Sequence, residues 1–174
     1  MDSSANKSVA TRKVTVKKKE VKVESGITYI NGIMLVNKKY ALPSTYNPGI
    51  NPTANQALKS LQAGASAAGH NIPLVSGFRS YSRQTTLYNN YVARDGVAKA
   101  DTYSARPGHS EHQSGLAFDV GAIDDNYGNT PAGIWLKDNC HKYGFIIRYP
   151  KGKENVTGHY YEPWHIRYVG EDIS

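Results

Sequence analysis

Apolar residues recur along the chain at two spacings, and these spacings predict both helices and strands. Leu58, Leu61 and Ala65 follow one another at three- and four-residue intervals. This period predicts a helix that begins with Thr53 as its N-cap and stops at Gly69. The same reasoning predicts two further helices, over residues 82–95 and 132–143.

Shorter apolar runs predict the strands, at residues 72–75, 116–120, 145–149 and 164–169. Residues 27–36 are typical of a hairpin, because the Asn31-Gly32 pair at its centre suits the positive φ angles of a type I′ turn. Helices and short strands follow one another without a βαβ rhythm. The predicted fold class is therefore α+β, with a small antiparallel sheet flanked by helices.

Length and composition favour one domain with an N-terminal extension. The 174 residues are 39% hydrophobic and 20% charged, enough to form a core. No apolar run approaches the roughly 18 residues of a membrane-spanning helix. We assign residues 26–174 to the domain and residues 1–25 to a basic linker or tail. The start lacks the apolar segment of a signal peptide, although a signal removed earlier remains an alternative.

The tail carries much of the positive charge. Residues 1–25 contain seven basic and three acidic residues, against a net charge of +7 for the whole chain. A solvated linker is the plain interpretation, and attraction to an anionic cell wall or membrane face is the alternative. The valine pairs 14/16 and 21/23 are compatible with a marginal strand. Nucleic acid is not expected as a partner, because the domain shows no basic stripe interleaved with aromatic residues.

The single cysteine, Cys140, excludes an internal disulfide framework and any multi-cysteine zinc site. It falls among apolar residues of the predicted helix 132–143. We therefore expect a buried, unreactive thiol.

Two short stretches contain the candidate chemistry. Residues 110–119 (SEHQSGLAFD) include His112 and Asp119, and residues 162–165 (EPWH) include His165. Three nitrogen or oxygen ligands with an open fourth position are typical of a catalytic zinc. The carboxylate of Glu162 remains available to take a proton from water.

Spacing alone leaves this interpretation open. His112 and Asp119 lie seven residues apart, unlike the i,i+4 histidines of a helical zinc motif. In a regular strand Glu162 and His165 would point to opposite faces, unless Pro163 bends the chain. Asp119 as a buried hydrogen-bonding carboxylate and His165 as an ordinary core histidine are the alternatives.

Three ordered motifs carry a family resemblance. They are Ser76-Gly77-Phe78-Arg79-Ser80, Ser110-x-His112-x2-Gly115-x-Ala117-x-Asp119 and Glu162-x-Trp164-His165. Together they resemble the VanY-like zinc D-alanyl-D-alanine carboxypeptidases, over about residues 36–170. The segments 103–108 and 143–145 are most similar to the LdcB-like L,D-carboxypeptidase branch.

The resemblance implies roles for particular residues. His112, Asp119 and His165 are expected to bind Zn²⁺, in the small antiparallel sheet, and Glu162 to act as general base and then acid. Arg79 is expected to hold a substrate carboxylate or the developing oxyanion, and Ser110, Gln84 and Trp164 to contact substrate. Without the motifs, Arg79 would be interpreted as a surface ion pair and Trp164 as a core residue. The other histidines are expected to be exposed or structural, and His109 is the first candidate among them to line the cleft, because it lies three residues before His112.

The implied activity is removal of the C-terminal D-alanine from peptidoglycan stem peptides. L,D-cleavage of tetrapeptides is slightly favoured over D,D-cleavage of pentapeptides. The expected protein is a monomer outside the membrane of a Gram-positive bacterium, secreted to the wall or held at the membrane face. A wall endopeptidase and a non-catalytic wall-peptide-binding module are the alternatives. Glu162 argues against the binding module, because binding needs no proton-transfer group there.

Overall fold

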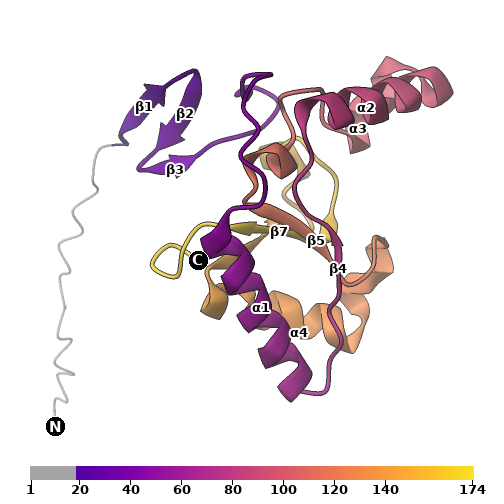
Figure 1. The fold of residues 1–174 in the computed structure, drawn as a ribbon. Coiled ribbons are helices and arrows are strands. Elements are labelled where there is room, and N and C mark those ends of the chain that lie inside the picture. Colours follow the sequence, from indigo (N-terminus) through magenta and orange to yellow (C-terminus); the bar gives the residue numbers. More distant parts are fainter. Residues whose placement is uncertain (1–18) are drawn as a thin grey trace, which may run out of the picture.

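The computed structural model describes residues 19–174 and contains two antiparallel sheets (Figure 1). The first has the order β1-β2-β3, formed by Val21–Glu24, Ile27–Ile30 and Ile33–Met34. The second has the order β4-β5-β7-β6, formed by Leu74–Ser76, Ala117–Val120, Glu162–Tyr168 and Phe145–Tyr149. The predicted α+β class with an antiparallel sheet is confirmed.

Five α-helices and three 3₁₀ helices connect these strands within the described residues. The α-helices are α1 (Pro52–Ala67), α2 (Tyr81–Asp95), α3 (Val97–Tyr103), α4 (Pro131–Asn139) and α5 (Glu154–Thr157). The 3₁₀ helices are η1 (Glu111–Ser114), η2 (Asp125–Asn129) and η3 (Cys140–Tyr143). No helix among residues 19–174 combines the length and apolar character needed to cross a bilayer.

The helix predictions need three corrections. The N-cap of α1 is Asn51, whose side chain accepts a hydrogen bond from the Ala54 N–H, and Thr53 lies inside the helix. The predicted helix 132–143 divides into α4 and η3. Helix α3 was not predicted, because only Ala100 in it is buried and it has no apolar period.

The N-terminal hairpin is confirmed. Asn31 and Gly32 have φ angles of 50° and 80°, as a type I′ turn requires. Strand β1 lies within the range that we assigned to the tail, and its Val21 and Val23 pair with β2. The valines at 14 and 16 lie outside the described residues, and the domain boundary itself stays a prediction.

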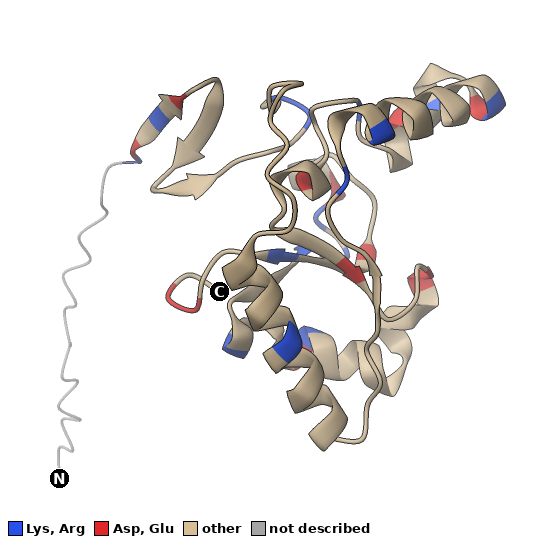
Figure 2. Ribbon diagram, in the orientation of Figure 1, with Lys and Arg blue, Asp and Glu red and all other residues tan. Residues whose placement is uncertain are grey.

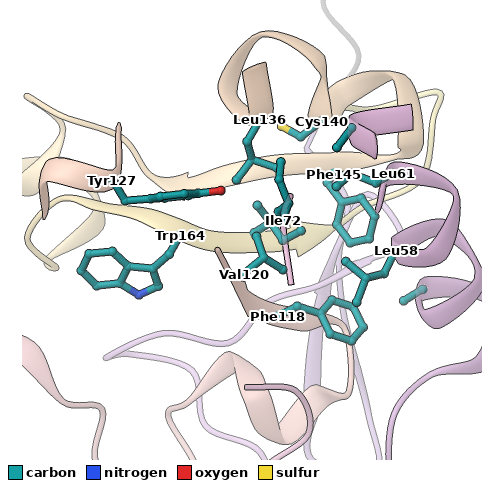
Figure 3. Packing of buried hydrophobic residues seen from close by; sticks show 13 residues of the cluster. Leu58, Leu61, Ile72, Phe118, Val120, Tyr127, Leu136, Cys140, Phe145 and Trp164 are labelled. Carbon is teal, nitrogen blue, oxygen red and sulfur yellow. The ribbon is translucent and has the colours of Figure 1, made fainter. Parts of the chain in front are cut away.

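The main core lies between one face of the four-stranded sheet and the helices α1 and α4 (Figure 3). Alternate residues of the two central strands face this core, namely Phe118 and Val120 of β5 and Trp164 and Ile166 of β7. Side chains of successive strand residues point to opposite faces. Asp119 and His165 therefore point to the face that the two helices leave uncovered.

Cys140 belongs to this core and is 3% exposed. Burial raises the pKa of its thiol to about 11. The predicted buried thiol is confirmed.

Candidate metal centre

Strands β5 and β7 place two candidate ligands directly opposite each other. Asp119 pairs with His165 in the antiparallel register, and the Asp119 Oδ1 lies 3.1 Å from the His165 Nδ1. The third candidate, His112, comes from η1, and its Nε2 lies 3.1 Å from the Asp119 Oδ2. One ligand atom from each residue falls within 4.8 Å of the others, and all three residues are buried. The structure thus brings the three predicted ligands together.

The turn that carries His112 is fixed by its backbone. The His112 carbonyl accepts a hydrogen bond from the Arg79 N–H at 3.2 Å. Gly115 ends η1 with a φ of +72°, and a Cβ there would lie 2.1 Å from the Gly49 carbonyl oxygen. Only glycine fits this position. The His112 Nδ1 lies 2.7 Å from the Gly77 carbonyl, so it donates its proton there and leaves Nε2 free as a ligand.

An irregularity in β7 brings Glu162 to the same site. Ile147 pairs with Ile166, but Tyr149 already pairs with Glu162, so β7 contains extra residues between the two pairs. Pro163 lies in this interval and has no N–H to offer the ladder. The Glu162 Oε2 consequently lies 3.7 Å from the His165 Nδ1. The bend that the prediction required at Pro163 is present.

The two carboxylates differ in their affinity for protons. Burial raises the pKa of Glu162 to about 7. Burial would also raise the pKa of Asp119, but His112 and His165 together hold it well below its usual range. For His165, burial is outweighed by Asp119 and Glu111, which raise its pKa to about 10. Such a divergence is typical of a site in which one carboxylate binds a cation and the other carries protons.

Arg79 is held beside these carboxylates by hydrogen bonds. Its guanidinium donates to the Gln84 Oε1 at 3.0 Å and to the Ser76 Oγ at 3.1 Å, and it lies 3.9 Å from the Asp119 Oδ2. Gln84 in turn donates to the Ala105 carbonyl at 2.7 Å. Burial lowers the pKa of Arg79. Arg79 is therefore a partly buried, oriented cation, and Gln84 orients it.

A cleft contains all eight predicted site residues: Arg79, Gln84, Ser110, His112, Asp119, Glu162, Trp164 and His165. Trp164 lines this cleft and also belongs to the core, and its contact with substrate stays a prediction. The expectation for His109 was wrong. It lines a neighbouring pocket, because its Nδ1 binds the Asn37 carbonyl at 2.7 Å.

The cleft is also lined by residues that the site prediction did not name, and Glu111, Tyr149 and His159 are among them. The Tyr149 ring lies 5.0 Å from that of His165 and 4.6 Å from that of His159, between centroids. Glu111 is 4% exposed and contacts His165 from the other side. A signal for Glu111 did exist in the sequence, because Arg148 and Arg167 interrupt apolar strands and require a buried anion.

The donor atoms present fit a zinc ion. Two imidazole nitrogens and one carboxylate oxygen form a usual ligand set of a catalytic zinc, which keeps one position open. The carboxylate of Glu162 lies next to this set in the same cleft.

Comparison with known proteins identifies the family. Residues 47–171 match the family model for VanY, D-alanyl-D-alanine carboxypeptidase. The chain belongs to this family.

Solved structures agree with this assignment. The chain is 46% identical to an L,D-carboxypeptidase DacB from Streptococcus pneumoniae, with a TM-score of 0.78, covering 89% of this chain and 88% of that one. It is 39% identical to the LdcB LD-carboxypeptidase, with a TM-score of 0.79, covering 89% and 86%. It is 35% identical to the D,D-pentapeptidase VanY solved with Zn(II), with a TM-score of 0.69, covering 79% and 88%.

Curated relatives are longer proteins. The chain is 34% identical over 165 residues to a D-alanyl-D-alanine carboxypeptidase of Enterococcus faecium, a match that covers 95% of this chain and 50% of that protein. The chain spans roughly half to two thirds of the length of the curated relatives it matches.

Proposed function

We propose that this protein is a zinc-dependent carboxypeptidase that removes the C-terminal D-alanine from peptidoglycan stem peptides. The observation that carries the proposal is the position of Glu162. This carboxylate lies 3.7 Å from a candidate ligand, in a cleft with all three ligands, and burial raises its pKa to about 7. A general base that works near neutral pH needs such a value.

The residues of the cleft have different roles in the proposed reaction. His112, Asp119 and His165 hold the ion, and a zinc ion held there supplies Lewis-acid chemistry at the scissile carbonyl. Glu162 takes a proton from the attacking water and returns it to the leaving amine. Arg79 stays charged and presents a fork of donors, which suits the substrate carboxylate or the developing oxyanion. Ser110 and Trp164 line the cleft and contact the peptide.

Within this reaction we favour L,D-cleavage of tetrapeptides over D,D-cleavage of pentapeptides. The resemblance of residues 103–108 supports this choice, as do the DacB and LdcB structures, which are described as L,D-carboxypeptidases. The D,D-pentapeptidase VanY has a lower identity to this chain. The same proposal places the protein, as a monomer, outside the membrane at a Gram-positive cell wall, with the basic tail in contact with anionic wall or membrane.

Mass spectrometry of synthetic stem peptides tests the activity. We expect release of D-alanine from a tetrapeptide acid, much slower release from its C-terminal amide, and release slowed about 10²- to 10⁴-fold with Glu162→Gln. Cleavage of a pentapeptide with the tetrapeptide left intact would establish the D,D alternative. Equal turnover of acid and amide, or cutting of cross-linked wall, would establish an endopeptidase.

A further inference from the structure

A buried group of charges lies behind His165, on the side away from Asp119. Glu111 is 4% exposed, and its Oε2 lies 3.3 Å from the His165 Nε2. Its other oxygen, Oε1, accepts a hydrogen bond from the Arg148 Nε at 2.7 Å and lies 3.4 Å from the Arg167 Nη1. We call Glu111, Arg148 and Arg167 the Glu111 cluster.

Both arginines of the Glu111 cluster are themselves anchored. The Arg167 Nη2 donates to the Met34 carbonyl at 2.8 Å, and its Nε donates to the Tyr168 carbonyl at 3.2 Å. The Arg148 guanidinium lies over the Tyr149 ring, 5.1 Å from its centroid. Glu111 lines the cleft, whereas neither arginine does. The arginines can therefore affect the cleft only through the groups that they hold.

The geometry determines which nitrogen of His165 faces the ligand site. A neutral imidazole ligates through one ring nitrogen and carries its proton on the other. The Nδ1 of His165 faces Asp119, and its Nε2 faces Glu111. The Glu111 carboxylate accepts a hydrogen bond from the Nε2–H of His165. The proton thus stays on Nε2, and the lone pair of Nδ1 points toward the other candidate ligands. His112 is arranged in the opposite sense, with Nδ1 on the Gly77 carbonyl and Nε2 free.

We propose that Glu111, held by Arg148 and Arg167, is a positioning residue that fixes His165 with Nδ1 toward the metal. This inference rests on the proposed zinc centre and assigns the Glu111 cluster to metal affinity rather than to substrate binding. Buried Glu111 also offsets part of the positive charge of the two arginines beside it.

Zinc affinity, measured by competition with a chromophoric chelator, tests the proposal without any substrate. In Glu111→Gln the single carbonyl oxygen can accept from His165 or from Arg148 but not serve both, so the dissociation constant for zinc should rise about 10- to 100-fold. Arg148→Met leaves Arg167 in place and should raise the constant less. Glu154→Gln makes the same chemical change at an exposed site and should leave it unchanged.

Two further measurements separate positioning from loss of fold. The melting temperatures of the metal-free variants report folding, and the visible spectrum of the cobalt-loaded protein reports ligand geometry. We expect an altered cobalt spectrum in Glu111→Gln. Unchanged zinc affinity and an unchanged spectrum would overturn the proposal. If Glu111→Gln does not fold, Arg148→Met decides the question, and unchanged zinc affinity in that variant overturns it. Failure of the unsubstituted protein to bind zinc would instead overturn the proposed metal centre, and this inference with it.

Discussion

Two sets of ion pairs in this protein use the same chemistry at nearly the same distance and differ in their contact with water. The arm formed by α2 and α3 carries both acidic and basic residues (Figure 2). Asp101 of α3 lies 2.6 Å from Arg106, which follows this helix and is 58% exposed. Behind the candidate metal centre, Glu111 lies 2.7 Å from Arg148, which is 18% exposed. Exposed pairs are screened and contribute little, whereas removing one partner of a buried pair leaves a charge without solvent. Distance alone therefore does not rank these interactions.

The carboxylate pKa values also differ between the exposed arm and the buried cleft. On the arm the neighbouring arginines lower the pKa of both Asp95 and Asp101 to about 2. In the cleft the shifts go in opposite directions, upward for Glu162 and downward for Asp119. Of these two regions, only the buried one moves the pKa values of its carboxylates in opposite directions.

The largest effect is expected from Glu162. Glu162→Gln removes the proton acceptor and leaves all three ligands, so the rate should fall about 10²- to 10⁴-fold while the zinc content stays the same. Turnover of the tetrapeptide and metal analysis of the same sample check this. Loss of zinc together with activity would make Glu162 a ligand instead.

The second-largest effect is expected on removal of zinc, which should lower the free energy of unfolding. An ion that binds only the folded state at 100 times its dissociation constant adds about 2.7 kcal/mol to the free energy of unfolding. Urea denaturation with and without a chelator measures this difference. Identical curves would contradict a metal centre at this position.

A smaller loss is expected for Arg79→Lys. Lysine keeps the charge but loses the fork that binds Gln84, Ser76 and the substrate, so kcat/KM should fall roughly tenfold, the worth of one charged hydrogen bond. Steady-state kinetics on the tetrapeptide measures it. Unchanged kcat/KM would remove Arg79 from the proposed site.

The smallest effect is expected on the arm. Asp101→Asn should cost at most about 1 kcal/mol of stability, and less in high salt. Because the folded-state pKa of Asp101 is depressed, its contribution is present above the unfolded value of 3.8 and is lost as the pH falls through about 2. Chemical denaturation of both proteins at neutral and acidic pH tests this. A cost as large as that of zinc removal would contradict the contrast drawn between the two regions.

The sequence predicted the parts of the fold and site that depend on local pattern. The hairpin at Asn31-Gly32 and the strand alternation of β5 are local properties, and both were predicted correctly. The three candidate ligands and Glu162, which the structure brings together, were singled out because the residue types and their order follow a family motif. Spacing alone did not suffice, since a regular strand would have separated Glu162 from His165.

Long-range contacts account for what could not be predicted. Glu111 occupies a position that the motif leaves unspecified, between Ser110 and His112, and its contacts come from Arg148 and Arg167, which are 37 and 56 positions away. The N-cap of α1 was missed because Asn51 precedes Pro52 inside a loop-like segment. Pro52 occupies the first turn, where its missing N–H costs nothing.

The hydrogen bond from Arg167 to the Met34 carbonyl has a consequence for transplanting this site into other proteins. The family match begins at residue 47, whereas Met34 belongs to β3 of the N-terminal sheet. A segment cut at the border of the match would carry every candidate ligand and the proposed general base, but the buried Arg167 guanidinium would lose one of its two main-chain acceptors, the Met34 carbonyl. The smallest transferable unit therefore includes the hairpin, although no residue of that hairpin lines the cleft.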